Sequence, residues 1–231
     1  MQKWKLPMLL VGAVTLLLGV PANAESWRDI KNIADDAIYY DHRVTFYCGC
    51  PYISDDDSDG SGDPVLSSCG YDGPDTHSSR ATRIEWEHVV PASLMPARQF
   101  ECWLEGGRDN CERNDPRAQA MIFDLHNLVP SIGQVNALRL NDRYGELEGE
   151  KRNFGTCAIE DSKGMFEPRD SERGDVARIW LYMTDKYGVE LEPQEREMFL
   201  RWHKADPPSQ WEIERDRRIY AIQGASNPWL Q

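Results

Sequence analysis

The sequence has 231 residues, of which 40% are hydrophobic and 28% are charged. It carries 39 acidic against 26 basic side chains, which gives a formal net charge of −13. This balance excludes a protein whose whole surface attracts polyanions, so any function on nucleic acid must rest on a local site.

The N-terminus has the three parts of a secretory signal over 1–24. Lys3 and Lys5 precede an apolar run over 8–20, and a small-x-small cleavage motif ends at Ala24. The apolar run is shorter than the roughly 20 residues that span a bilayer. We therefore expect a mature protein over 25–231 that is exported to the periplasm or the medium, stays off the membrane, and is a monomer with a single domain.

Six cysteines lie in the mature part, which an exported protein exposes to an oxidising compartment. We expect three disulfides, whose pairing stays open because six cysteines allow 15 pairings. A zinc site is the less favoured alternative, because the spacings lack two C-x-x-C pairs. The cysteines are Cys48, Cys50, Cys69, Cys102, Cys111 and Cys157.

The first predicted element is an amphipathic helix over 26–42, where apolar residues recur at spacings of three and four. A short strand is predicted over 44–47. The run DDDSDGSGDP, over 55–64, combines like charges with glycine and proline and predicts a solvated loop. Residues 82–90 are rich in β-branched and aromatic types, which predicts a strand that Pro91 ends.

The middle of the chain is predicted to be rich in loops. Residues 95–114 hold a Gly-Gly pair and two cysteines, which indicates an irregular excursion held by disulfides. Asp115 and Pro116 are typical of an N-cap and a first helical residue, and this helix is expected to run toward His126. A second short helix is expected to start near Ser131.

Three helices are predicted in the C-terminal part. Apolar spacing over 176–187 indicates a helix that Gly188 ends, and two more are predicted over 194–204 and 210–223. Together these elements predict an α+β fold that is mainly helical around a small central sheet.

The densest cluster of chemically capable side chains lies at the end of the predicted strand over 82–90. Glu87 offers a carboxylate for a hard cation, and His88 offers an imidazole that can accept a proton near neutral pH. Adjacent strand residues point to opposite faces, so both can serve one site only if the chain bends before Pro91. From these two residues alone, a surface glutamate and a structural histidine are the favoured interpretation.

A second cluster is DLHNLVP, over 124–130. Asn127 has a neutral oxygen that suits magnesium, and His126 adds a second imidazole. Asparagine is also common at helix ends, so a structural role stays open.

Four ordered motifs resemble the endonuclease I family of periplasmic and extracellular bacterial nucleases. The similarity continues through 211–228, so it covers most of the mature chain. The motifs are TFYCGC (45–50), RIEWEHVVPA (83–92), CW-x-x-GGR-x-x-C (102–111) and DLHNLVPSIGQVNALR (124–139).

The resemblance implies a ββα-metal (His-Me finger) active site in a mixed, mainly helical fold. His88 matches the general base and Glu87 the metal-binding carboxylate. Asn127 matches the second metal ligand, and Arg108 matches an arginine that contacts the scissile phosphate. His126 matches no catalytic role, and we expect it to be structural.

These residue types suit phosphodiester hydrolysis. The site must activate water, neutralise the phosphoryl oxygens and stabilise the leaving alkoxide. We expect His88 to take the proton from water and Arg108 to bind the phosphoryl group. Mg²⁺, or Mn²⁺ or Ca²⁺ in its place, would stabilise the 3′ oxygen as it leaves. This predicts cleavage of double- and single-stranded DNA, and of RNA as a second candidate, to 5′-phosphate and 3′-hydroxyl ends with little sequence preference.

The chain departs from the family pattern in its cysteines. Members often carry eight, two of them near the C-terminus, whereas this chain has none after Cys157. One family disulfide is therefore expected to be missing, and we expect the C-terminal helices to fray more easily.

The acidic segment 55–63 looks like an insertion. Its aspartates and Gly60 fall at positions 1, 3, 5, 6 and 9 of a calcium loop, but Leu66 stands where position 12 needs a glutamate. A solvated loop is therefore favoured over a calcium site.

Two other functions and two further hypotheses complete the expectations. A secreted, non-catalytic calcium-binding module would leave Gly-Gly-Arg unexplained, and a zinc hydrolase using His88 and His126 lacks the H-E-x-x-H spacing. The net charge suggests adaptation to salt, which screens repulsion between the acidic surface and DNA. The cysteines suggest that the protein stays inactive until it leaves the cytoplasm.

Overall fold

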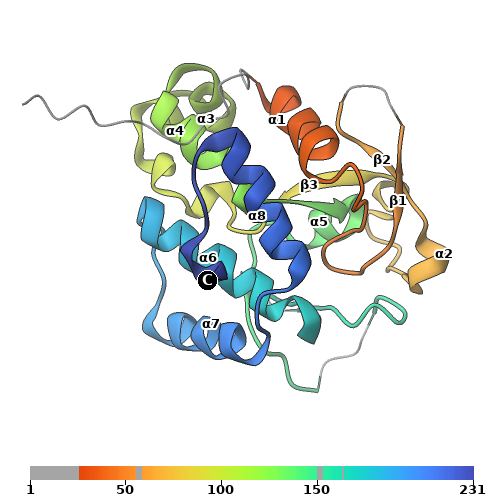
Figure 1. Cartoon of the computed structure of the whole chain (residues 1–231). Coiled ribbons are helices and arrows are strands. Elements are labelled where there is room, and N and C mark those ends of the chain that lie inside the picture. Colours follow the sequence, from red (N-terminus) through yellow and green to blue (C-terminus); the bar gives the residue numbers. More distant parts are fainter. Residues whose placement is uncertain (1–25, 56–58, 150–152, 163) are drawn as a thin grey trace, which may run out of the picture.

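The computed structural model shows an α+β protein built from helices and short strands (Figure 1). The predicted signal over 1–24 and Asp57 of the calcium-loop pattern lie outside the residues that it describes. No helix in the described part of the chain is long and apolar enough to cross a membrane. The described residues are 26–55, 59–149, 153–162 and 164–231.

Within these residues the strands form three small sheets, where one central sheet was predicted. β3 (Ile84–His88) and β4 (Leu128–Ile132) pair antiparallel along their whole length, with Glu87 opposite Val129 and His88 opposite Leu128. The other two sheets are the pair β1 (Tyr52–Ser54) with β2 (Gly62–Pro64), and the set β5 (Arg143–Tyr144), β7 (Met165–Glu167) and β6 (Glu160–Ser162) in that order.

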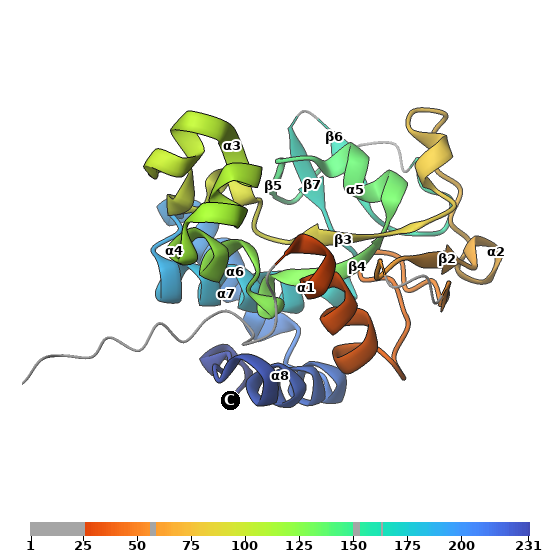
Figure 2. The same cartoon turned by 90° about the horizontal axis from the view of Figure 1, so that it is seen from above.

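Helices surround the β3–β4 pair. Figure 2 shows the pair between α5 on one side and α1 and α8 on the other. α6 and α7 pack side by side on a further flank (Figure 1). The α-helices are α1 (Trp27–Ile33), α2 (Leu66–Cys69), α3 (Glu101–Asn114), α4 (Pro116–Ile122), α5 (Gly133–Arg139), α6 (Arg173–Tyr187), α7 (Pro193–Ala205) and α8 (Gln210–Gln223).

Most predicted helix ends are confirmed, because they rest on local capping chemistry. The Asp115 side chain accepts a hydrogen bond from the Arg117 backbone, and Pro116 follows it as the first residue of α4. Gly188 ends α6 in the left-handed region, at φ 74°. The two later helices, α7 and α8, also lie where they were predicted.

Several local predictions were wrong. The loop predicted over 55–64 contains strand β2, and the helix predicted over 26–42 ends earlier, with a π-helix over Ala34–Ile38 as its last part. Residues 44–47 form no strand beyond a single bridge from Val44 to Pro51, because disulfides at Cys48 and Cys50 close this stretch into a turn. The predicted excursion over 95–114 is mostly helical. The helix after Pro116 ends at Ile122, well before His126.

Strand β4 and helix α3 were missed for identifiable reasons. β4 contains Pro130, which argues against a strand, yet its five residues are all buried against neighbouring elements. α3 contains Gly106 and Gly107, whose backbone torsions are not helical and which kink the helix. The glycine pair therefore bends this segment without converting it to a loop.

The three expected disulfides are present, and they staple different parts of the chain. Cys48–Cys157 joins residues far apart in the sequence, and Cys50–Cys69 fastens the β1–β2 pair. Cys102–Cys111 brackets the kink of α3. The described part of the chain contains no free cysteine.

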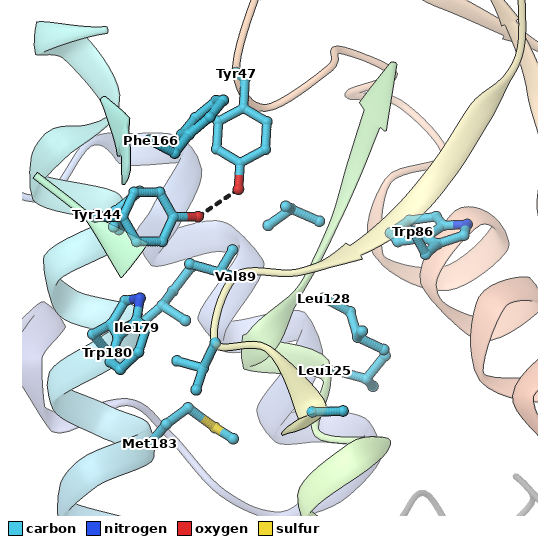
Figure 3. Packing of buried hydrophobic residues seen from close by; sticks show 14 of the residues in the cluster. Tyr47, Trp86, Val89, Leu125, Leu128, Tyr144, Phe166, Ile179, Trp180 and Met183 are labelled. Carbon is cyan, nitrogen blue, oxygen red and sulfur yellow. Dashed lines mark hydrogen bonds between the residues drawn. The ribbon is translucent and has the colours of Figure 1, made fainter. Parts of the chain in front are cut away.

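The main core lies between β3, β4 and α6. Figure 3 shows Val89, the residue after β3, among Ile179, Trp180 and Met183 of α6. All four are almost completely buried. Close packing on this side fixes the end of β3, where Glu87 and His88 lie.

Candidate active site

A cavity of about 630 Å³ lies along β3. Segments that are far apart in the sequence meet around it, so it is formed by the tertiary fold. Its walls are residues 83–88 in and before β3, Trp27 and Lys31 of α1, residues 59–61 and 91–93, Trp103 and Arg108 of α3, and Asn136, Arg139, Leu140 and Asn141 in and after α5.

Three of the four predicted active-site residues line this cavity. They are Glu87, His88 and Arg108. The bend that both β3 residues need to serve one site follows directly at 89–90. The fourth residue, Asn127, does not line it.

His88 is oriented from two sides. Its ring stacks on Trp27 of α1, with centroids 5.0 Å apart and planes inclined by 14°. Its Nε2 lies 2.8 Å from the carbonyl oxygen of Ile122. A carbonyl only accepts hydrogen bonds, so Nε2 carries the proton and Nδ1 is the unprotonated, basic nitrogen.

The environment of His88 keeps it neutral. Burial, and then the nearby charge of Arg108, lower the pKa of His88 to about 3. Nδ1 makes no hydrogen bond to any described residue. A neutral imidazole with one nitrogen fixed and the other free can accept a proton from water at neutral pH.

Glu87 is held at one oxygen. Its Oε1 accepts hydrogen bonds from the Tyr47 hydroxyl, at 3.3 Å, and from Nε of the buried Arg139. The Tyr47 hydroxyl is in turn bonded to that of Tyr144 (Figure 3). Oε2 makes no hydrogen bond to the described residues, so this oxygen is available to a cation.

Asn136 of α5 presents a second oxygen to the same cavity. Its Nδ2 donates to Oε2 of Glu85 at 2.9 Å, which leaves Oδ1 as the available atom of the amide. Glu85 is itself fixed by Arg80 and Arg83. The sequence prediction missed Asn136, although it lies inside the motif over 124–139, because that motif holds two asparagines and nothing in the sequence distinguished them.

Asn127, predicted to be the second metal ligand, has a different place in the structure. It is fully buried, its Oδ1 accepts from the Val90 backbone N–H at 2.7 Å, and its Nδ2 donates to the Val90 carbonyl at 3.0 Å. Both polar atoms of its amide are therefore used to hold the bend after His88. This placement argues against the predicted role as a metal ligand, because Asn127 does not line the cavity and its amide oxygen is already bonded.

His126 also lies outside the cavity lining. It is 1% exposed, and its Nε2 donates to the Ala225 carbonyl at 2.9 Å. The pairing of His88 with His126 that a zinc hydrolase would need is thus not formed. More generally, the described residues contain no group of three or more His, Cys, Asp or Glu side chains placed to hold a metal ion.

Arg108 reaches the cavity because of the kink in α3. It follows Gly107, which has a φ of 70°, and its guanidinium lies 5.6 Å from the centroid of the Trp27 ring. An ion pair with Glu112 at 2.9 Å steadies it, while its side chain stays 39% exposed. The guanidinium therefore stays accessible to an anionic ligand beside His88.

The donor atoms at this site fit a hard divalent cation. Glu87 offers a carboxylate oxygen and Asn136 an amide oxygen. Magnesium accepts oxygen ligands and commonly takes only one or two from protein, leaving the rest to water and phosphate. Thiolates are excluded, because all six cysteines are in disulfides.

Comparison with known proteins gives consistent matches over the chain. The family model described as Endonuclease I matches residues 28–231. An extracellular deoxyribonuclease of Aeromonas hydrophila is 40% identical over 228 residues, covering 96% of each chain. A periplasmic deoxyribonuclease of the same organism is 39% identical and covers 98% of this chain and 94% of its own length. Endonuclease-1 of Buchnera aphidicola subsp. Acyrthosiphon pisum (strain APS) is 42% identical over 188 residues, covering 80% of this chain and 73% of its own.

Proposed function

Because the chain belongs to the endonuclease I family, we propose that it is a metal-dependent endonuclease that hydrolyses DNA with His88 as general base. Its relatives are named extracellular and periplasmic deoxyribonucleases, and the protein is located in the periplasm or the medium. RNA is a second candidate substrate. A non-catalytic calcium-binding module is not favoured, because that function would explain neither the cavity nor the similarity of this chain to nucleases.

One observation carries the proposal: the two nitrogens of His88 have different surroundings. Nε2 is bound to the Ile122 carbonyl, whereas Nδ1 has no hydrogen-bond partner among the described residues, and His88 lines a cavity together with Glu87 and Arg108. A histidine that serves only structure would use both nitrogens or face the core. This arrangement supports a general base next to an anion-binding group.

The protein groups divide the work of hydrolysis. Nδ1 of His88 takes a proton from the attacking water, and Arg108 binds an oxygen of the phosphoryl group. Glu87 and Asn136 would hold the divalent cation, with Asn136 taking the place predicted for Asn127. A cation there supplies charge stabilisation at the phosphoryl and 3′ oxygens. As the water oxygen bonds to phosphorus, the P–O3′ bond breaks and the 3′ oxygen takes a proton from solvent, which leaves 5′-phosphate and 3′-hydroxyl ends.

The secondary structure around the site supports a ββα-metal finger. β3 ends at His88, β4 pairs with it, and α5 follows directly with Asn136 on it. α3 and α4 lie within the connection between the two strands, and they bring Arg108 to the cavity. We propose that 25–231 is a single nuclease domain organised around this finger.

The test is nicking of supercoiled plasmid by the full mature chain. The wild type is assayed in Mg²⁺ and in EDTA, and the Glu87→Gln variant is assayed in Mg²⁺. We expect nicking by the wild type in Mg²⁺ alone, and we expect DNA ligase to seal the nicks, since ligase requires 5′-phosphate and 3′-hydroxyl ends. Nicking that continues in EDTA would contradict the proposed dependence on a metal ion. Nicks that ligase cannot seal would contradict the proposal that the 3′ oxygen is the leaving group.

The acidic composition motivates a second proposal, that the enzyme is adapted to salt. Salt screens repulsion between the acidic surface and DNA, and the Debye length falls to about 3 Å at 1 M. We expect the nicking rate to rise with sodium chloride before it falls. A steady decline from low salt, which release of counterions from many basic contacts would cause, would contradict this proposal.

A further inference from the structure

A strained leucine stands at the edge of the cavity. Leu140 directly follows α5, with φ 50° and ψ −113°. These torsions are close to those of the first central residue of a type II′ turn, a position that glycine dominates. A hydrogen bond of 2.9 Å from the Asp142 N–H to the Arg139 carbonyl closes this turn. Among the described residues with positive φ, only His77 and Leu140 are not glycine.

The protein maintains this strain through Arg139. Its guanidinium donates to the Asp142 carbonyl at 3.1 Å, to the His88 carbonyl at 2.6 Å, and to Glu87. The turn is thus fastened to the two residues at the centre of the site. Strained backbone persists where surrounding contacts determine it, and such places are often functional.

Packing inside the protein gives no reason for a leucine here. Leu140 lines the cavity, yet it is 65% exposed, so its side chain buries little surface within the chain. Asparagine or glycine would adopt the same turn with less strain. A single exposed leucine is ordinary, but this one combines a strained backbone with a place in the cavity lining, where its side chain can contact what binds there.

The charges of the cavity favour an additional, non-ionic contact with substrate. Arg83 is paired with Glu85 and Arg108 with Glu112, at 2.8 and 2.9 Å, and Arg139 is paired with Glu87. These pairs weaken the attraction of the arginines for phosphate in a chain whose net charge is already −13. Apolar contacts with sugars and base edges are not weakened in this way, and leucine is among the residues that proteins place in the minor groove.

We propose that Leu140 is a substrate-binding residue that packs against the sugars and base edges of DNA beside the scissile phosphate. This rests on the proposed nuclease function and adds a binding contact to it. The contact is independent of sequence and of phosphate charge, so it suits a nuclease without base preference that works in salt.

The experiment compares three variants of the full mature chain in cleavage of duplex DNA. For Leu140→Gly we expect KM to rise about fivefold with kcat within about twofold, because a binding contact worth about 1 kcal/mol is lost. Its Tm should stay the same or rise, since glycine relieves the strained torsion. Leu140→Met keeps an apolar side chain and should leave KM within about twofold of the wild type. His77→Gly relieves the other strained residue, which does not line the cavity, and should leave KM unchanged.

Each outcome decides the matter. An unchanged KM for Leu140→Gly would overturn the proposal while leaving the nuclease function in place. A fall in kcat at unchanged KM would also overturn it, because it would show that Leu140 acts through Arg139 on the chemistry. A wild-type chain that does not cut DNA in Mg²⁺ would remove the nuclease function and, with it, this contact.

Discussion

Two histidine-bearing segments of this protein resemble each other in sequence and differ in structure. Glu87 and His88 end β3, whereas His126 and Asn127 lie in the short 3₁₀ helix Leu125–Asn127. Both histidines are buried and both donate from Nε2 to a backbone carbonyl. The two segments differ in their other polar atoms. His88 and Glu87 line a cavity, and each has one polar side-chain atom without a hydrogen bond to the described residues, whereas both polar atoms of the Asn127 amide bond to Val90.

The second segment belongs to a buried polar cluster under α8, in which most polar atoms are paired. Asp124, fully buried, accepts hydrogen bonds from Tyr182, Tyr187, Lys186 and Gln223. Arg215 of α8 donates to the carbonyls of Leu125, His126 and Leu128. These bonds fasten the C-terminal helix without a disulfide. Buried polar groups that satisfy one another stabilise a fold, and groups with a free atom at a cavity can carry chemistry.

Substitutions of the two asparagines should have the largest and most distinct effects. Asn136→Ala should lower kcat/KM for DNA by about 10²–10³-fold, because it removes the amide oxygen that we propose to bind the cation, and Asn136→Asp should keep most of the activity. Asn127→Ala should cost about 2 kcal/mol of unfolding free energy, because the Val90 backbone loses its partners. Activity assays, Mg²⁺ titration and urea unfolding measure these effects. Loss of metal affinity in folded Asn127→Ala protein would restore the original prediction.

The polar cluster around Asp124 should make the stability of the protein depend on pH. Burial alone would raise the pKa of Asp124, but Lys186, His126 and hydrogen bonds hold that pKa below its usual range. The folded pKa is therefore lower than the unfolded one, so the stabilisation is complete above the unfolded pKa and is lost as pH falls through the folded pKa.

Asp124→Asn tests this. At pH 7 the variant should lose about 3 kcal/mol of unfolding free energy, because Lys186 loses its partner. Urea unfolding at pH 7 and near pH 3 should show the gap between wild type and variant narrowing in acid. A gap of equal size at both pH values would show that the carboxylate charge contributes nothing.

Among the changes that affect the site, removal of a disulfide is expected to have the smallest effect on activity. It tests whether the site depends on contacts between distant segments of the chain. Cys102→Ser with Cys111→Ser should lower kcat about tenfold, because the bond brackets the kink that positions Arg108. Cys50→Ser with Cys69→Ser is the control, since that bond lies away from the cavity lining, and it should cost about 3 kcal/mol of stability at unchanged kcat.

Reducing the protein with dithiothreitol extends this test to the idea that disulfides keep the enzyme inactive in the cytoplasm. Reduced protein should be inactive or nearly so. Full activity after reduction would contradict it.

Local signals in the sequence predicted much of the fold. The caps at Asp115 and Gly188 are set by neighbouring residues, so the start of α4 and the end of α6 were placed correctly. β4 was missed because its burial on all sides comes from tertiary packing, which the sequence does not show. The proline within it also argues against a strand. The prediction of a single central sheet was wrong, because the short strands pair into three separate small sheets.

The site was predictable as far as residue types allow. Glu87, His88 and Arg108 come from motifs that resemble a known family, and the structure brings all three to one cavity. Our proposal of Asn136 over Asn127 rests on which amide oxygen has no hydrogen bond to the described residues, and the bonds to Val90 and Glu85 support it. No sequence pattern records such bonds.

The most direct test of the proposed catalytic role of His88 compares His88→Ala with His126→Ala in nicking of supercoiled plasmid in Mg²⁺. Each variant is first shown to be folded. We predict that His88→Ala lowers the initial rate by about 10³-fold or more, because water loses its general base. His126→Ala should nick at a rate within about tenfold of the wild type and unfold at a lower urea concentration. Comparable loss of nicking in both variants, or full nicking by His88→Ala, would contradict the assignment of the chemistry to the cavity at β3.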